Sequence, residues 1–121
     1  MPTVLICAED SVVQELARSP VWRDGLDREV TATADQAATL ATSVRPVLVV
    51  LDSAVPRAEW LVQKLRGNAA TQKISIVVVG RGDMGSDELG LLTAGANSVL
   101  RLPPTPEWNG PIERLLKVPT R

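Results

Sequence analysis

The sequence predicts an α/β domain with a five-stranded parallel sheet that carries helices on both faces. Short apolar runs alternate five times with longer segments of helical period, which is the pattern of βα units. The runs VLVVL and IVVV are continuously apolar, as expected for strands covered on both faces. Five strands in 121 residues suit the doubly wound, flavodoxin-like (βα)5 order 2-1-3-4-5. We expect one domain over residues 1–121, either a whole protein or part of a longer chain.

The first third of the chain is predicted to contain a strand, a helix and then a second strand at the edge of the sheet. Residues 3–8 (TVLICA) form an apolar run that predicts a strand. Ser11 is then a candidate N-cap for a helix over 12–18. The alternating run 28–34 (REVTATA) is typical of a strand at the edge of a sheet.

The middle of the chain contains the most apolar strand, between two predicted helices. An Ala-rich helix is expected over 35–44, with Asp35 as its candidate N-cap. Residues 46–51 (PVLVVL) predict a strand buried on both faces. Apolar residues at helical spacing predict a helix over 57–67, which Gly67 ends.

The last third of the chain supplies two strands and two helices. Residues 73–80 (KISIVVVG) predict another buried strand, and 86–96 predict a helix that ends at Gly95. A short fifth strand is expected over 97–102. A final helix lies within 103–118, where two prolines leave its first residue undefined.

Composition excludes several functional classes. Lys and Arg number 13 and Asp and Glu number 14, so no basic excess indicates nucleic-acid binding. There is no histidine, which removes Ser–His and Cys–His catalytic pairs. The apolar runs are far shorter than the ~20 residues of a membrane helix, and the N-terminus lacks the pattern of a signal peptide. We expect a cytoplasmic protein that is not an enzyme and binds neither nucleic acid nor membrane.

The rare residue types are expected to serve packing. Cys7 is the one cysteine, and its apolar surroundings predict a buried, inert thiol. Trp60 is expected to pack half-buried on its helix, whereas Trp22 and Trp108 lie near predicted element ends and are expected to be exposed or half-buried.

Acidic residues follow two strands that are neighbours in the predicted sheet. Glu9 and Asp10 follow the first strand, and Asp52 ends the third. Because the carboxyl ends of parallel strands meet at one edge, these side chains are expected to converge. Carboxylates and backbone carbonyls suit a hard cation such as Mg²⁺. Taken by itself, Asp52 is better explained as a strand-end or helix-capping carboxylate.

Four segments carry a further pattern, in the order VLICAEDS, VVLDSAVP, ISIVVVGRGD and LLTAGANSVLRLPPTP. Their order and spacing resemble the CheY-like receiver domains of two-component response regulators, over nearly the whole chain. The resemblance implies that Asp52 is the phospho-acceptor. It also implies that Mg²⁺ is held by Glu9, Asp52 and the backbone carbonyl of Ala54, with Asp10 as a further candidate.

Four positions depart from the pattern of these receiver domains. Ala8 stands at the first acid, Val79 at the hydroxyl residue of the fourth strand (Gly80 if the register slips by one), Val99 at the switch aromatic and Leu102 at the lysine before proline. In the family, the lysine and the hydroxyl contact a phosphoryl group of about −1.5 to −2 charge. Apolar side chains cannot do this, so little phosphorylation-driven switching is expected. Because Ala8 stands in place of the first acid, Mg²⁺ binding is expected to be weak or absent. The adjacent Arg101 is expected to face the opposite way.

We therefore expect a degenerate receiver of a bacterial two-component or phosphorelay pathway, acting by protein–protein interaction with weak or no phosphorylation-driven switching. The resemblance implies a histidine kinase or an output protein as partner, contact through residues 86–117, and a monomer or weak homodimer. One alternative is a working atypical regulator that a histidine kinase phosphorylates on Asp52, with Glu9 and Asp10 holding Mg²⁺ weakly. Another is a small nucleotide-binding protein that uses GRGDMG at 80–85. This segment fits G-x-G-x-x-G but follows the fourth predicted strand.

Overall fold

The structure, a computed structural model, describes residues 2–82 and 84–116. Its strands and helices alternate along the chain in the order β1 (Thr3–Cys7), α1 (Asp10–Leu16), β2 (Asp27–Thr31), α2 (Ala34–Val44), β3 (Leu48–Asp52), α3 (Ala58–Arg66), β4 (Ser75–Arg81), α4 (Ser86–Ala94), β5 (Ser98–Leu102), the 3-10 helix η1 (Pro106–Trp108) and α5 (Asn109–Leu116). The five strands form one parallel sheet in the order β2-β1-β3-β4-β5. The predicted doubly wound, flavodoxin-like fold is confirmed.

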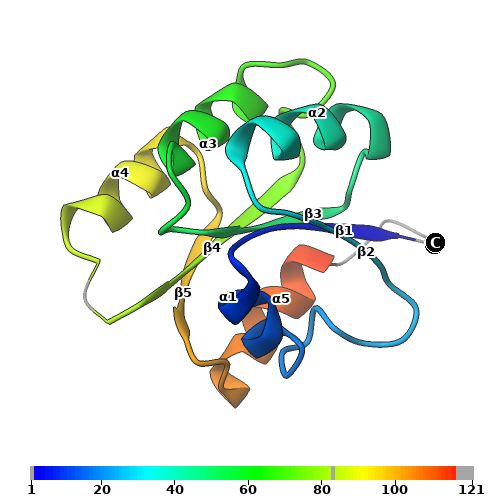
Figure 1. The fold of residues 1–121 in the computed structure, drawn as a ribbon, viewed down its shortest axis with the longest axis vertical. Helices are drawn as coiled ribbons and strands as arrows, with labels where there is room; N and C mark the ends of the chain where they lie inside the picture. Colours follow the sequence, from blue (N-terminus) through cyan, green and yellow to red (C-terminus); the bar gives the residue numbers. More distant parts are fainter. Residues whose placement is uncertain (1, 83, 117–121) are drawn as a thin grey trace.

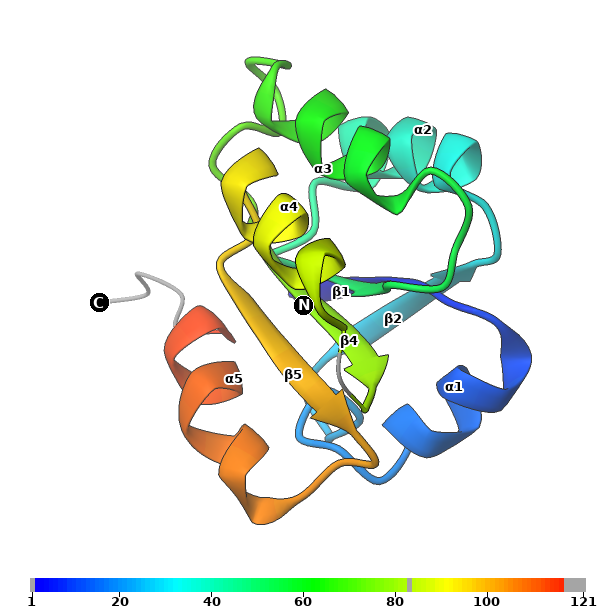
Figure 2. The same cartoon turned by 90° about the vertical axis from the view of Figure 1, so that its left-hand side faces the viewer.

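The helices form two layers, one on each face of the sheet. Helices α2, α3 and α4 cover one face, and α1 and α5 cover the other (Figures 1 and 2). Successive side chains of a strand point to opposite faces. In β3, Val49 and Leu51 therefore belong to the core under α2–α4, while Leu48 and Val50 belong to the core under α1 and α5. We call these two clusters the α2–α4 core and the α1/α5 core.

Two helices end where the sequence predicts. Helix α3 buries Ala58, Leu61, Val62 and Leu65 and has Gly67 as its C-cap, and α4 has Gly95 as its C-cap. Gly95 has φ +130°, a conformation that side chains with a Cβ rarely adopt. Judged by length and apolar character together, no helix in residues 2–82 and 84–116 could span a lipid bilayer.

Two predicted N-caps are each wrong by two residues. Helix α1 begins at Asp10 with Glu9 as its N-cap, so Ser11 lies inside the first turn. Helix α2 begins at Ala34, and the Thr33 side chain caps it by accepting a hydrogen bond from the backbone N–H of Gln36 at 3.2 Å. Asp35 is therefore inside the helix. A cap is the residue at which the backbone leaves the extended region, and residue type alone does not place that change.

The expected exposure of Trp108 is also wrong. This residue is only 2% exposed and belongs to the α1/α5 core. Its indole Nε1–H donates to the carbonyl of Arg101 at 2.9 Å, so the polar atom is satisfied inside the protein. Trp60 is half-buried against the α2–α4 core, as predicted, and Trp22 is half-buried against the α1/α5 core.

Candidate functional site

Asp52 is the last residue of β3, at the carboxyl edge of the sheet, and its side chain is only 3% exposed. Its Oδ1 accepts a hydrogen bond from the backbone N–H of Ala54 at 2.9 Å. Its Oδ2 is buried and has no hydrogen-bond partner among the described residues. A buried oxygen without a partner costs stability and needs a reason. Oδ2 is therefore the candidate ligand atom or nucleophile of this edge.

The surroundings of Asp52 are apolar on the face that α1 and α5 cover. Strand alternation places Asp52 on this face with Leu48 and Val50, and its register partner on β4 is Val79. The α1/α5 core includes Ala8, Val79 and Leu102, which are 2%, 0% and 7% exposed. The residues that the predicted resemblance aligns with polar switch groups are thus buried and apolar.

The predicted acids reach the same edge of the sheet but not one cluster. Glu9 and Asp10 begin α1 and are exposed, and the Ser11 hydroxyl donates to Glu9 Oε1 at 3.0 Å. Within the described residues, no group of three or more His, Cys, Asp or Glu side chains is placed to hold a metal ion. What remains for Mg²⁺ is Asp52 Oδ2, Glu9 and the carbonyl of Ala54. All three are oxygen donors, the kind of ligand that Mg²⁺ prefers.

Known structures resemble this architecture over almost its full length. A putative response regulator from Chloroflexus aurantiacus is 24% identical, with 96% of this chain and 98% of that chain covered and a TM-score of 0.82. The beryllofluoride-activated receiver domain of RstA from Klebsiella pneumoniae is 21% identical, with 98% and 100% covered and a TM-score of 0.79. The chain has the fold of a response regulator receiver domain.

A third receiver domain gives a reference for the metal. It belongs to a sensor histidine kinase of Pseudomonas aeruginosa and has a magnesium ion coordinated in its active-site cleft. It is 19% identical to this chain, with 95% of this chain and 97% of that chain covered and a TM-score of 0.80. No protein-family model matches the sequence, and a search of the curated proteins finds no match.

In this receiver fold, the side of β5 that faces α4 points away from Asp52. Val99 is half-buried against the α2–α4 core. Two residues further on the same face, Arg101 forms an ion pair with Glu88 of α4 and donates to Met84 Sδ at 3.6 Å. Arg101 therefore faces away from Asp52, as strand alternation predicts.

Arg81 is a candidate site residue that sequence reasoning missed. It ends β4, two residues after Val79 and on the same face as Asp52. Its guanidinium pairs with both carboxylate oxygens of Glu15 on α1. The signal was present in the sequence, because strand alternation places the residue two positions after Val79, which is Arg81, on the same face as Val79.

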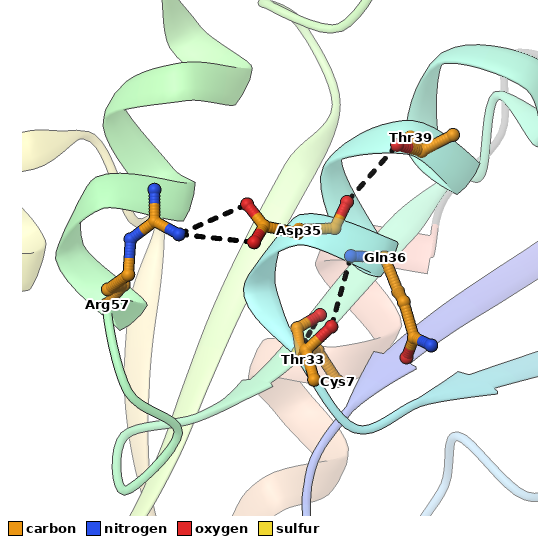
Figure 3. Close-up of polar contacts among 6 residues, drawn as sticks. All are labelled: Cys7, Thr33, Asp35, Gln36, Thr39 and Arg57. Carbon is orange, nitrogen blue, oxygen red and sulfur yellow. Dashed lines mark hydrogen bonds and ion pairs between the residues drawn. The ribbon is translucent and has the colours of Figure 1, made fainter.

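The loop after Asp52 is anchored to α2, within the layer that α2, α3 and α4 form (Figure 3). Arg57, at the start of α3, donates from Nη1 to both carboxylate oxygens of Asp35 on α2, at 3.1 and 3.2 Å. Its guanidinium also lies 4.0 Å from the centroid of the Trp60 ring. Arg57 has φ +67°, a strained conformation for a residue with a Cβ. These contacts hold the loop that positions the Ala54 amide and carbonyl.

Cys7 lies behind the site, in the α2–α4 core, and its Sγ–H donates to the Thr33 carbonyl at 3.4 Å. Burial raises the pKa of the Cys7 thiol, a hydrogen bond with Thr31 partly offsets this, and the charge of Asp52 raises the pKa further. The folded protein thus keeps the thiol proton above the ordinary pKa of 9.0, where the unfolded chain releases it. The free energy of unfolding is therefore expected to fall as pH rises above that value.

Urea denaturation at a series of pH values measures this effect. The Cys7→Ala variant is expected to show a flatter decline above pH 9.0, because the proton uptake that distinguishes the folded state is gone. Parallel declines for the two proteins would contradict the assignment.

The glycine-rich segment 80–85 includes Asp83, which lies outside the described residues. Gly80 is part of β4 rather than of a turn. A Cβ at Gly80 would lie 2.5 Å from Met84 Sδ and 2.6 Å from Ser53 Oγ, so close packing accounts for this glycine. Gly82 and Gly85 have φ of +58° and +55°, which accounts for these two by backbone conformation. None of the three requires a bound nucleotide as its reason.

Proposed function

We propose that this chain is a signalling domain of receiver type, in a two-component or phosphorelay pathway, that acts mainly by protein–protein interaction. The observation that carries the proposal is the buried apolar packing of Ala8, Val79 and Leu102 around a retained Asp52. Leu102 cannot pair with a phosphoryl oxygen, and Val79 cannot donate a hydrogen bond to one. Charge at Asp52 therefore has no polar path through these positions toward β5 and α4.

The proposed contact surface is residues 86–117, of which residue 117 lies outside the described residues. Helix α4 presents two exposed leucines on this surface: Leu89 is 68% exposed and Leu92 is 39% exposed. Exposed large apolar side chains on one helix suit a partner protein better than bulk water. A histidine kinase or an output protein of the pathway is the proposed partner.

Nuclear magnetic resonance (NMR) with beryllofluoride and Mg²⁺ tests the lack of switching. Beryllofluoride mimics a phosphoryl group on a carboxylate, so it reports on Asp52 without requiring a kinase. Backbone shifts are expected at Asp52 and in the loop after it, with little change in residues 86–116. Shifts that spread over α4 and β5 would show that switching survives.

A second candidate function follows from the unpartnered Oδ2 of Asp52. In it, Oδ2 attacks the phosphorus of a phosphohistidine on a kinase, a P–O bond forms as the P–N bond breaks, and the histidine nitrogen takes up a proton. Bound Mg²⁺ would supply charge neutralisation for the transferring group. Glu9, Asp52 and the carbonyl of Ala54 would hold it.

Incubation with acetyl phosphate and Mg²⁺, followed by intact-mass measurement, tests this second function. The protein is expected to gain one phosphoryl group, and Asp52→Ala is expected to lose the label completely. Asp24→Ala is the matched control, because Asp24 is an exposed acid in the turn between α1 and β2, outside the candidate Mg²⁺ ligands, and its removal is expected to leave the label in place. A label that persists in Asp52→Ala would place the acceptor elsewhere.

A further inference from the structure

Arg81 is a cationic side chain at the carboxyl end of β4, and it lies on the same face of the sheet as Asp52. On this face, β3 ends in Asp52, β4 in Arg81 and β5 in Leu102. Ala8 follows directly after β1 and lies on the same face. Asp52 is in register with Val79, so Arg81 is one strand across and two residues further along. Neighbouring strands lie ~4.8 Å apart and residues advance ~3.3 Å, which puts the two Cα atoms ~8 Å apart. An arginine side chain can cover most of that distance.

Glu15 now holds the Arg81 guanidinium on the α1 side of the site. Arg81 Nη1 donates to Glu15 Oε1 at 3.2 Å, and Nη2 makes a second contact with Oε2. The arginine side chain is 56% exposed and the glutamate 25%. Strand β3 lies between β4, which carries Arg81, and β1, which leads into α1. The ion pair therefore joins the two flanks of Asp52.

The pair with Glu15 is a weak hold compared with what a phosphoryl group would offer. Exposed ion pairs in water contribute little stability, because solvent screens them. A phosphoryl group carries about −1.5 to −2 charge against −1 for the carboxylate. In addition, the planar guanidinium group of arginine can donate two hydrogen bonds to two phosphoryl oxygens at once.

We propose that Arg81 is the anion-binding residue of the Asp52 site, and that it exchanges Glu15 for a phosphoryl-type group on Asp52. The proposal rests on the second function above, the uptake of such a group at Asp52. The exchange releases the side chain of Glu15 and so couples Asp52 to α1. This coupling to α1 differs from coupling through position 102 to α4, because the apolar Leu102 side chain cannot bind a phosphoryl oxygen.

A titration of beryllofluoride with Mg²⁺ present, followed by ¹H–¹⁵N NMR, tests the proposal on the 121-residue protein. The Nε–H signal of Arg81 is expected to shift together with the backbone signals of Asp52 and α1. Arg81→Ala is expected to weaken beryllofluoride binding by about tenfold, which is the usual effect of a lost charged hydrogen-bond donor. Glu15→Gln is expected to strengthen it by about threefold, because Arg81 is no longer held.

Arg101→Ala is the matched control. Arg101 lies beside Arg81 at the ends of β4 and β5 and also pairs with a helix glutamate, Glu88, but it is on the opposite face. Its removal is expected to leave beryllofluoride affinity unchanged. Thermal unfolding of each variant checks that the fold is intact, and Arg81→Lys is expected to bind with intermediate affinity because it keeps the charge but loses the planar guanidinium group.

The outcomes separate the two proposals. If beryllofluoride shifts no signal near Asp52 in the wild-type protein or in Glu15→Gln, uptake at Asp52 fails, and the role of Arg81 fails with it. If Asp52 responds with equal affinity in the wild-type protein, Arg81→Ala and Arg101→Ala, uptake at Asp52 stands and the role of Arg81 is overturned.

Discussion

Replacing Trp108 with alanine is expected to lower the free energy of unfolding by about 3–5 kcal/mol. The side chain is 2% exposed, so its removal leaves a large cavity in the α1/α5 core. The variant also loses the hydrogen bond from Nε1 to the Arg101 carbonyl, which anchors η1 to the end of β5. Chemical denaturation measures the loss.

Trp22→Ala is the matched control for Trp108→Ala. Trp22 packs against the same core but is only half-buried, and the Arg28 guanidinium lies 4.8 Å from its ring centroid. Its replacement is expected to cost clearly less than that of Trp108, since less apolar surface leaves contact with the core. Equal losses would contradict the burial of Trp108. The comparison bears on function, because Trp108 and Leu102 belong to the α1/α5 core, on the same face of the sheet as Asp52.

Replacing Arg66 with alanine is expected to cost about 2–4 kcal/mol, by removing a network of hydrogen bonds at one corner of the fold. The guanidinium of Arg66, the last residue of α3, donates to four acceptors, which are the carbonyls of Gly95, Gln72 and Ile74 and the Oδ1 of Asn97. Burial lowers the pKa of Arg66, yet an arginine remains charged at neutral pH. Removal leaves partly buried acceptors without a donor.

Two variants give the Arg66 experiment its contrast. Lys64→Ala changes an exposed cation on the same helix and is expected to leave the free energy of unfolding nearly unchanged. Arg66→Lys keeps the charge but cannot reach four acceptors at once, so it is expected to recover less than half of the loss. Full recovery by lysine would mean that charge, rather than geometry, is what α3 and the turn before β5 require. The corner matters to the proposed interaction, because it holds the C-terminal end of α4.

Much of the fold follows from local pattern. The five apolar runs and the helices between them appear in the structure with boundaries close to those expected, and continuous apolar runs correctly marked β3 and β4 as central strands. Helices α3 and α4 end at the predicted glycines. The errors are of another kind. The N-caps of α1 and α2 depend on single backbone angles, and the burial of Trp108 depends on where η1 packs after a proline-rich turn.

The sequence by itself determined the alternation of strands and helices, the position of Asp52 at the carboxyl end of its strand, and the apolar identity of Ala8, Val79 and Leu102. Period-2 and period-3.6 patterns and chain order carry that information, because each reflects which face of an element is buried. Only the tertiary structure decided that Asp52 Oδ2 has no partner among the described residues and that Arg81 reaches Glu15. Glu15 and Arg81 are far apart in the chain, and the contact exists because packing brings α1 and the end of β4 together on one face of the sheet.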